Sequence, residues 1–267
     1  PAVPLAPDGG ELEASPHLGA EPTDWEPPQA LHTIVLSFVG DCMIASFKGK
    51  TGPKTFNGVA ETVAPSHFFS GVYDIFSSDD FTVGNCENVF TDRPLTEVYK
   101  NYSPAYWYKS PTKNAQVFTA GSVEAVSVSN NHSGDYGTAG AEDTKKALEE
   151  AGVLWGDSDH PVIFEKYGVK IAVYMTGMWG EYRTVALSGK LAELEKISDY
   201  QIIYYHGGTE RKYEPDAWRM RASRKLIDAG ADLVIGNHPH VLQPIETYHG
   251  ADIVYSLGNF IFGGSPT

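Results

Sequence analysis

The sequence predicts an α/β fold, because short apolar runs of strand length alternate along the chain with segments of helical periodicity. The apolar runs end in polar side chains of the types that bind metal ions or transfer protons. In α/β folds ligands collect beyond the carboxyl ends of the strands, so a site is expected at that edge. Of the 267 residues, 42% are hydrophobic, which is enough for a sizeable core.

Two parts of the chain differ in composition. Residues 1–30 are rich in Pro, Gly, Ala and acidic side chains and predict a flexible tether. Residues 31–267 are predicted to form a single domain. The tether favours an exported protein whose membrane anchor lies outside this sequence, and no apolar run here approaches the roughly 20 residues that span a bilayer.

The predicted elements alternate in order. Strands are expected at residues 33–39, 81–84, 123–128, 201–205 and 232–235, with closing strands at 244–248 and 252–255. Helices are expected at residues 67–77, 111–120, 138–151, 186–197 and 215–229. Residues 162–165 and 169–174 flank Tyr167-Gly168 and predict a hairpin.

The two cysteines, Cys42 and Cys86, are too few for a disulfide scaffold and are predicted to be small buried side chains. The formal net charge of −14 and the pI near 5.0 argue against nucleic acid as a partner, because affinity there depends on basic groups at the phosphates. An acidic substrate would therefore need a local metal ion or a basic pocket.

The most specific local signal is a His-x-His sequence, His238-Pro239-His240, which closely follows the apolar run 232–235. Neutral imidazole is the commonest protein metal ligand. A strand alternates its side chains between two faces, so residues two apart can point the same way. We therefore expect both imidazoles to enter one crevice.

Polar side chains follow the other predicted strands as well. The donors at these strand ends are Asp41, Asn85 and Glu87, Asn131 and His132, His206, and His238 with His240. A mixture of carboxylate, amide oxygen and imidazole suits manganese, iron or zinc, whereas magnesium and calcium prefer oxygen ligands alone. The set is compatible with one divalent ion or with two ions that share a carboxylate.

Six motifs occur in order along the chain: GDCM, NCEN, NNHSGDYG, YHGG, GNHPHVLQ and YSLGNF. In this set, over about residues 33–262, the sequence resembles the CapA-type family of poly-γ-glutamate (capsule) biosynthesis proteins. That family is similar in fold to the calcineurin-like metallophosphatases. The resemblance implies a four-layer α/β/β/α sandwich, and an extracytoplasmic, membrane-anchored protein that works with other membrane components of a capsule synthesis complex.

The resemblance also implies a set of metal ligands. Matched position by position, these are Asp41, Glu87, Asn131, His206, His238 and His240. Asp41 matches the bridging aspartate of the metallophosphatase pattern. That pattern has a histidine where this chain has Met43, a weak ligand for hard ions, so one metal subsite is short of a ligand.

His132 is not a ligand in this scheme. We expect it to act beside the ion as a general acid or as a donor to the transition state. Asp135 lies three residues on and is placed to orient the imidazole ring. The alternative is that His132 is a structural turn residue and that Asp135 caps the turn before Tyr136-Gly137.

Basic and aromatic residues lie between the motifs. Arg93, Lys109 and Arg211 are candidates for binding a phosphate or carboxylate of a substrate, although for each one taken alone a solvated loop charge is the favoured interpretation. Residues 91–110 form a long loop dense in Tyr and Trp. This loop would serve as a lid or polymer-binding wall, or simply as packing.

Two functions stay open on the sequence alone. The first is a CapA-like, metal-dependent hydrolase that activates water at the ion and cleaves a phosphoester or a related bond of an acidic polymer. The second is a non-catalytic, membrane-anchored assembly or polymer-binding component with a degenerate metal site, which Met43 favours. A sugar- or peptide-binding domain without metal is disfavoured, because polar groups are costly to bury without a purpose.

Overall fold

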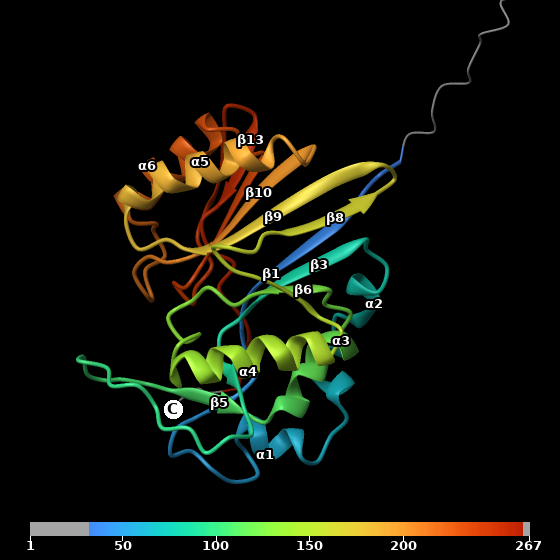
Figure 1. Cartoon of the computed structure of the whole chain (residues 1–267), viewed down its shortest axis with the longest axis vertical. Coiled ribbons are helices and arrows are strands. Elements are labelled where there is room, and N and C mark those ends of the chain that lie inside the picture. The colour runs from blue at the N-terminus through green and yellow to red at the C-terminus, as the bar shows by residue number, and fades with distance from the viewer. Residues whose placement is uncertain (1–31, 264–267) are drawn as a thin grey trace, which may run out of the picture. The chain divides into compact units, whose positions relative to one another are not determined.

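The computed structural model describes residues 32–263. The predicted tether, residues 1–30, lies outside the described residues. The fold is mixed α/β, with two large sheets that pack face to face and helices on their outer faces (Figure 1). The predicted fold class, a metallophosphatase-like α/β/β/α sandwich, is confirmed. No helix within residues 32–263 is long and apolar enough to span a bilayer.

The first sheet is parallel throughout. Its strands, in spatial order, are β14 (Asn259–Phe262), β1 (Leu36–Met43), β3 (Phe81–Cys86), β6 (Ala125–Ser127) and β7 (Leu154–Gly156). Every residue of the central strand β3 is buried. A parallel sheet covered on both faces buries both sides of its strands and favours mostly apolar runs, which explains why the run at 81–84 identified β3.

The second sheet has a parallel centre and antiparallel edges. Its order is β12 (Ile245–Tyr248), β13 (Ala251–Val254), β11 (Leu233–Asn237), β10 (Tyr200–His206), β9 (Val169–Gly177) and β8 (Val162–Lys166). The edge strands β8 and β12 run antiparallel to their neighbours. The predicted hairpin is therefore confirmed as β8 and β9.

Three apolar layers hold the sandwich together. The inner layer joins both sheets and includes Val83 and Ala125 from the first sheet and Val173, Ile202 and Ile235 from the second. The outer layers lie beneath α4 (Gly137–Glu150) on one side and beneath α5 (Thr184–Leu194) and α6 (Ala217–Asp228) on the other. Burial of this apolar surface is the main stabilising contribution to the fold.

Most of the smaller elements lie around the first sheet, whereas η3 (Glu181–Arg183) packs against α5 and α6 on the second. A third sheet has the order β2 (Ser46–Phe47), β5 (Tyr108–Ser110) and β4 (Val89–Phe90). The short helices are α1 (Phe56–Ala60), η1 (Pro65–Phe69), α2 (Tyr73–Phe76), η2 (Thr112–Ala115), α3 (Gln116–Ala120) and η3. The aromatic loop thus contributes β5 at its end and is not wholly irregular.

Some predicted elements differ from the observed ones. The single helix predicted at 67–77 is wrong, because η1 and α2 are separate pieces with Gly71 between them. The helix predicted at 111–120 begins as 3-10 turns and becomes α-helical only from Gln116. Strands β7 and β14 were not predicted. Both are short and depend on their partners in the sheet.

Candidate metal centre

The strand ends of both sheets meet at one rim. Asp41 pairs in register with Asn85 of β3 and with Asn259 of β14, and His206 pairs with Asn237 of β11. The hydroxyl of Tyr204 on β10 donates a 2.6 Å hydrogen bond to the carbonyl of Val39 on β1, across the sandwich. This hydrogen bond connects the two sheets close to the polar side chains at the ends of β1 and β10.

Asp41 is fully buried and lies at the centre of the cluster. Its Oδ1 lies 3.4 Å from Nδ1 of His206, and its Oδ2 lies 3.0 Å from Nδ1 of His240. The Asn85 amide donates to Oδ1 at 2.8 Å, and the backbone N–H of His238 donates to Oδ2 at 3.2 Å. Four residues from three segments of the chain therefore converge on one carboxylate.

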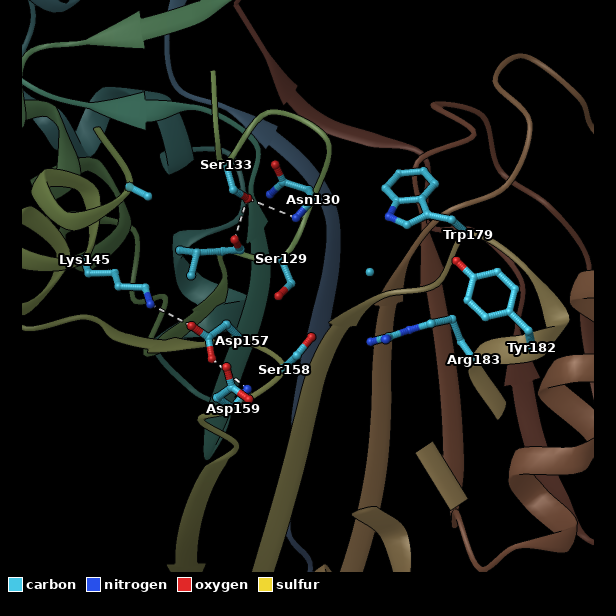
Figure 2. Close-up of a pocket in the computed structure, with 13 residues that line it drawn as sticks. Ser129, Asn130, Ser133, Lys145, Asp157, Ser158, Asp159, Trp179, Tyr182 and Arg183 are labelled. Carbon is cyan, nitrogen blue, oxygen red and sulfur yellow. Dashed lines mark hydrogen bonds and ion pairs between the residues drawn. The ribbon is translucent and has the colours of Figure 1, made fainter. Parts of the chain in front are cut away.

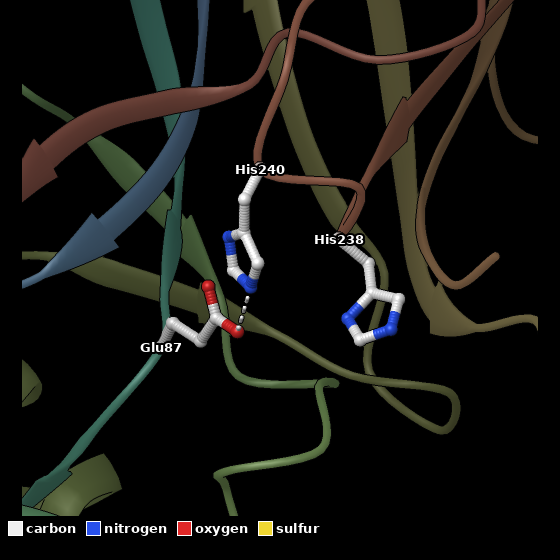
Figure 3. Close-up of side chains that lie close together, drawn as sticks. All are labelled: Glu87, His238 and His240. Carbon is white, nitrogen blue, oxygen red and sulfur yellow. Dashed lines mark ion pairs between the residues drawn. The ribbon is translucent and has the colours of Figure 1, made fainter. Parts of the chain in front are cut away.

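Glu87 is the side chain that most directly indicates a cation. It is fully buried, and neither of its carboxylate oxygens has a hydrogen-bond partner among the described residues. Oε1 lies 3.5 Å from Nε2 of His206 and 3.8 Å from Nε2 of His240, as Figure 3 shows for the second pair. A buried carboxylate without donors is costly unless a positive charge sits beside it.

Two overlapping groups have the composition and spacing of metal sites. One consists of Glu87, His238 and His240, and the other of Asp41, Glu87 and His206; within each group the donor atoms lie within 4.8 Å of one another. Carboxylate and imidazole together suit manganese, iron or zinc. The residues present therefore fit a divalent ion, and Glu87 belongs to both groups.

The acid–base properties of these groups follow from their burial. Burial raises the pKa of Glu87 well above its ordinary value, and the neighbouring Asp41 carboxylate raises it further. Burial also disfavours ionised Asp41, but its hydrogen bonds to His206 and His240 outweigh this and hold its pKa well below the usual range. One carboxylate is thus ionised without a metal, whereas the other needs a cation.

The pKa values of the three imidazoles are also shifted in different directions. Burial lowers the pKa of His206, and burial together with the nearby His206 and His240 lowers the pKa of His238 to about 2. For His240 burial also lowers the pKa, but the hydrogen bond to Asp41 and the Asp41 charge raise it overall. His206 and His238 are therefore neutral near pH 7, as metal ligands must be.

The His-x-His segment is a turn rather than a strand end. Strand β11 ends at Asn237, and His238 and His240 have φ values of 97° and 58°. The expectation that strand alternation directs both rings into the site is therefore wrong. Their direction is set instead by the positive φ values of the two residues that flank Pro239. Such backbone is costly for residues other than glycine, and the Asn259 side chain, 2.8 Å from Nδ1 of His240, helps to hold this ring.

Asn131 lies at the same site, with Oδ1 2.8 Å from Nε2 of His206. The preceding Asn130 reaches into the first sheet, where its amide donates to Oδ1 of Asn85 at 3.0 Å and to the carbonyl of Cys86 at 2.8 Å. All six predicted ligands are therefore brought to one rim. Their role as ligands stays a prediction.

His132 and Asp135 are in direct contact. Nδ1 of His132 lies 2.9 Å from Oδ2 of Asp135, which also accepts a 2.8 Å hydrogen bond from the backbone N–H of Tyr108. Lys100, from the aromatic loop, places its ammonium 2.6 Å from Oδ1 of Asp135. Asp135 is fully buried, so this pairing fixes its orientation and through it the orientation of His132.

Met43 occupies an apolar environment. It is fully buried in a cluster with Ala45 and Tyr108, against which Phe262 packs. The ring of Phe262 also contacts the ring of His240, with centroids 5.6 Å apart. The position where the metallophosphatase pattern has a histidine is thus filled by a hydrophobic side chain.

The two cysteines are buried, as predicted, and they are free, although they pair in register on β1 and β3. Gly207 follows His206, and a Cβ there would lie 1.9 Å from the carbonyl oxygen of Met178. The absence of a side chain at position 207 lets the backbone pack closely beside the site.

The predicted substrate-binding bases lie in different places. Arg93 is engaged by Asp143 through two hydrogen bonds of 2.7 Å and by the carbonyl of Ala139. Lys109 lies over the ring of Tyr136 at 5.0 Å. Arg211 is exposed beside the His-x-His turn, where its backbone N–H donates to the carbonyl of Pro239. Their role in substrate binding stays a prediction.

Other residues of the site were not predicted. Trp179 follows β9, and its ring contacts the rings of His238 and His206 with centroids 5.1 and 5.8 Å apart. Arg219 of α6 is fully buried; it donates to the hydroxyl of Tyr205, to the Gln243 side chain at 2.6 Å and to the carbonyl of Tyr255. Trp179 and Arg219 lie in none of the six motifs, whereas Asn130 and Asn259 had a sequence signal, because they lie within NNHSGDYG and YSLGNF.

Comparison with known proteins identifies the same family as the six sequence motifs. The family described as "Bacterial capsule synthesis protein PGA_cap" matches residues 35–264. The chain is 31% identical to "PGA biosynthesis protein CapA" of Bacillus subtilis (strain 168), over 85% of this chain and 62% of the relative. It is 27% identical to "Capsule biosynthesis protein CapA" of Bacillus anthracis, over 86% of this chain and 60% of the relative.

A solved structure supports the fold. The crystal structure of a hypothetical protein from Thermus thermophilus superposes with a TM-score of 0.52 at 15% identity, covering 84% of this chain and 75% of the other. The chain spans about three fifths of the length of the two CapA relatives. Since the family match extends over nearly all of the described residues, the chain belongs to the bacterial capsule synthesis protein family of CapA type.

Proposed function

We propose that this chain is a metal-dependent hydrolase of a capsule-polymer synthesis system, and that it cleaves a phosphoester or a related bond. The observation that carries this proposal is the buried Glu87 carboxylate, which lacks any hydrogen-bond partner among the described residues and faces the imidazoles of His206 and His240. A divalent cation is the partner whose charge would compensate it.

The residues divide into two roles. Asp41, Glu87, His206, His238 and His240 would hold the ion, with Asn131 as an amide ligand. When bound, the ion would act as a Lewis acid and activate water as a nucleophile. His132 would donate a proton to the leaving group. Its contact with Asp135, and the contact of Asp135 with Lys100, support this role because they fix which ring nitrogen faces the carboxylate.

The test is turnover of a generic aryl phosphate by protein loaded with manganese, iron or zinc. The proposal predicts metal-dependent hydrolysis that chelation removes. His240→Ala should lose both metal and turnover, whereas His249→Ala, a change at an exposed histidine 3.1 Å from Asp228, serves as the matched control. Protein that carries a stoichiometric ion and hydrolyses no phosphoester with any of these metals would contradict the hydrolase proposal.

A second candidate function is favoured by one observation, the burial of Met43 among apolar side chains. In this alternative the chain is a non-catalytic polymer-binding or assembly component that uses the ion to hold carboxylates. It predicts that poly-γ-glutamate pulls the metal-loaded protein down without being cleaved. Binding that survives chelation and His240→Ala would place the polymer away from the metal ligands.

The biological setting is proposed from the relatives. One relative is named for PGA biosynthesis and another for capsule biosynthesis. We propose that this chain acts on an acidic polymer of that kind or on a phosphoester in its synthesis, together with other membrane components. The extracytoplasmic, membrane-anchored location predicted from the tether and the family also stays a proposal.

A further inference from the structure

A cavity of about 500 Å³ lies beside the candidate metal centre, a size typical of small-molecule pockets. One wall comes from residues that follow β6 and β7, among them Ser129, Asn130 and Ser158. The facing wall comes from the segment after β9, with Trp179, Tyr182 and Arg183 (Figure 2). The cavity therefore opens where the carboxyl ends of both sheets face each other.

Two residues connect this cavity to the metal centre. Asn130 lines it and also donates to Asn85, which in turn donates to Asp41. Trp179 lines it and packs its ring against His238. A neighbouring cavity of about 670 Å³ shares Asn130 and Trp179 and adds Asn131. A ligand in the first cavity would thus lie next to the residues proposed to hold the ion.

The two basic side chains of the cavity differ in whether they form an ion pair. Lys145 pairs with Asp157 at 2.7 Å, and Asp157 also accepts hydrogen bonds from the backbone N–H groups of Asp159 and His160. Arg183, by contrast, makes one long contact, 3.5 Å from Nη2 to Oγ1 of Thr176. Within residues 32–263 no carboxylate lies within salt-bridge distance of its guanidinium.

Most of the six arginines have a charged or buried partner, so the lack of an ion pair at Arg183 within residues 32–263 is unusual. Arg93, Arg221 and Arg224 each pair with a carboxylate, and Arg219 is buried with three acceptors. Arg211 has no ion pair in the described part of the chain either, but it is exposed and does not line the cavity. Figure 2 shows the guanidinium of Arg183 directed into the cavity, toward the wall that carries Ser158.

We propose that this cavity binds a carboxylate of the acidic polymer, with Arg183 as the group that recognises it. This inference rests on the proposed function, because it places the substrate beside that same centre. The planar guanidinium can donate two parallel hydrogen bonds to one carboxylate. The side chains of Ser129, Asn130 and Ser158 provide polar partners, and the rings of Trp179 and Tyr182 provide a flat surface for the aliphatic part of a glutamyl residue.

The charge of the lining favours a carboxylate over a phosphate. Two cations, Lys145 and Arg183, and two carboxylates, Asp157 and Asp159, line the cavity, so their formal charges cancel. A single carboxylate is matched by Arg183, which has no ion pair within residues 32–263. A phosphate dianion would bring an additional negative charge close to Asp159, which is unfavourable. The cavity is therefore expected to select a monoanionic group.

The test measures binding of a short γ-linked glutamate oligomer to the metal-loaded protein by calorimetry. Arg183→Gln should weaken binding by about tenfold to a hundredfold, the usual effect of losing a charge-assisted hydrogen bond. Arg183→Lys should lie between, because it keeps the charge without the planar fork. The matched control is Arg224→Gln, which removes the same charge at Glu246, away from the cavity, and should bind as the wild type does.

A second ligand makes the test specific. The same oligomer with its α-carboxylates converted to carboxamides should bind the wild type and Arg183→Gln equally. The inference is overturned if the wild type does not bind the acidic oligomer, or if Arg183→Gln binds it as tightly as the wild type does. It is also overturned if Arg183→Gln weakens binding of the acidic oligomer and of the carboxamide oligomer by the same factor. Metal content, measured on each variant, should not change with Arg183→Gln. Failure of the hydrolase proposal would instead appear as metal-loaded wild type that binds the oligomer and turns over no aryl phosphate.

Discussion

Oε1 of Glu87 lies 3.5 Å from Nε2 of His206, although Glu87 starts the segment after β3 in one sheet and His206 ends β10 in the other. The contact joins the two halves of the sandwich at a point where neither Glu87 oxygen has a hydrogen-bond donor in the described part of the chain. The arrangement is unfavourable for the protein alone and favourable with a cation, so it links the stability of the fold to metal binding.

Glu87→Gln should therefore have opposite effects with and without metal. In metal-free protein the change removes a buried acid and should raise the free energy of unfolding by about 1 kcal/mol. With saturating metal the wild type should be the more stable, because an ion that binds only the folded state stabilises it by mass action. Denaturant unfolding of both proteins, with and without chelator, checks this; equal metal-induced stabilisation of the two would contradict it.

His132→Ala should reduce kcat by about 10²- to 10⁴-fold, the usual contribution of a general acid. Asp135→Asn should cause a smaller loss, because it acts through the orientation of His132 and of Lys100. Neither residue is a proposed ligand, so metal content should be unchanged in both variants. Aryl phosphate kinetics and elemental analysis on the same samples separate the two effects, and loss of metal in His132→Ala would assign it a different role.

Arg219→Gln should destabilise the fold by about 3 kcal/mol, because it leaves the carbonyl of Tyr255 and the Gln243 side chain without a buried donor. Each such unsatisfied group costs about 1–3 kcal/mol. Arg221→Gln, on the same helix but with a half-exposed side chain paired to Glu181, is the control and should cost less than about 1 kcal/mol. Equal midpoints of urea unfolding for the two variants would show that the buried contacts of Arg219 contribute little.

Asp157→Asn should lower the free energy of unfolding by about 1 kcal/mol at pH 7, because it weakens the hydrogen bond with Lys145. Burial acts to raise the pKa of Asp157, but hydrogen bonds from Lys145 and from the backbone lower it overall, below the ordinary 3.8. A carboxylate whose pKa falls on folding stabilises the protein above the ordinary value, and this stabilisation disappears as the pH falls through the folded value.

The difference between wild type and Asp157→Asn should accordingly be constant from neutral pH down to about pH 5 and should shrink below pH 3.8. Urea unfolding at a series of pH values measures it. A difference that is as large at about pH 3 as at neutral pH would mean that the ion pair with Lys145 does not hold Asp157 ionised.

The sequence predicted the sandwich well where strands are covered on both faces. The runs that became β3, β10 and β11 are mostly apolar without a regular polar alternation, and this pattern is typical of buried parallel strands. It did not predict β14, whose place is set by pairing with β1 from the other end of the chain. The helix predicted at 67–77 failed because helical spacing of apolar residues does not reveal a break at Gly71.

The candidate site was predictable as a set of strand ends but not as a geometry. All six ligand positions reach one rim, yet the positive φ values of His238 and His240 come from the turn and not from strand alternation. Trp179 and Arg183 carry no local motif; only the packing of the segment after β9 beside the first sheet brings them to the site. Residues that reach a site only through tertiary packing produce no periodic pattern in the sequence, so they could not be predicted from it.

Whether Glu87 and the surrounding imidazoles bind a divalent ion is decided by elemental analysis of the purified protein and of Glu87→Gln, after incubation with manganese, iron and zinc and removal of free ions. Glu87 belongs to both candidate ligand groups, so we expect one or two divalent ions per wild-type chain and none in the variant. A wild type that retains no ion, or a variant that retains as much as the wild type, would contradict it.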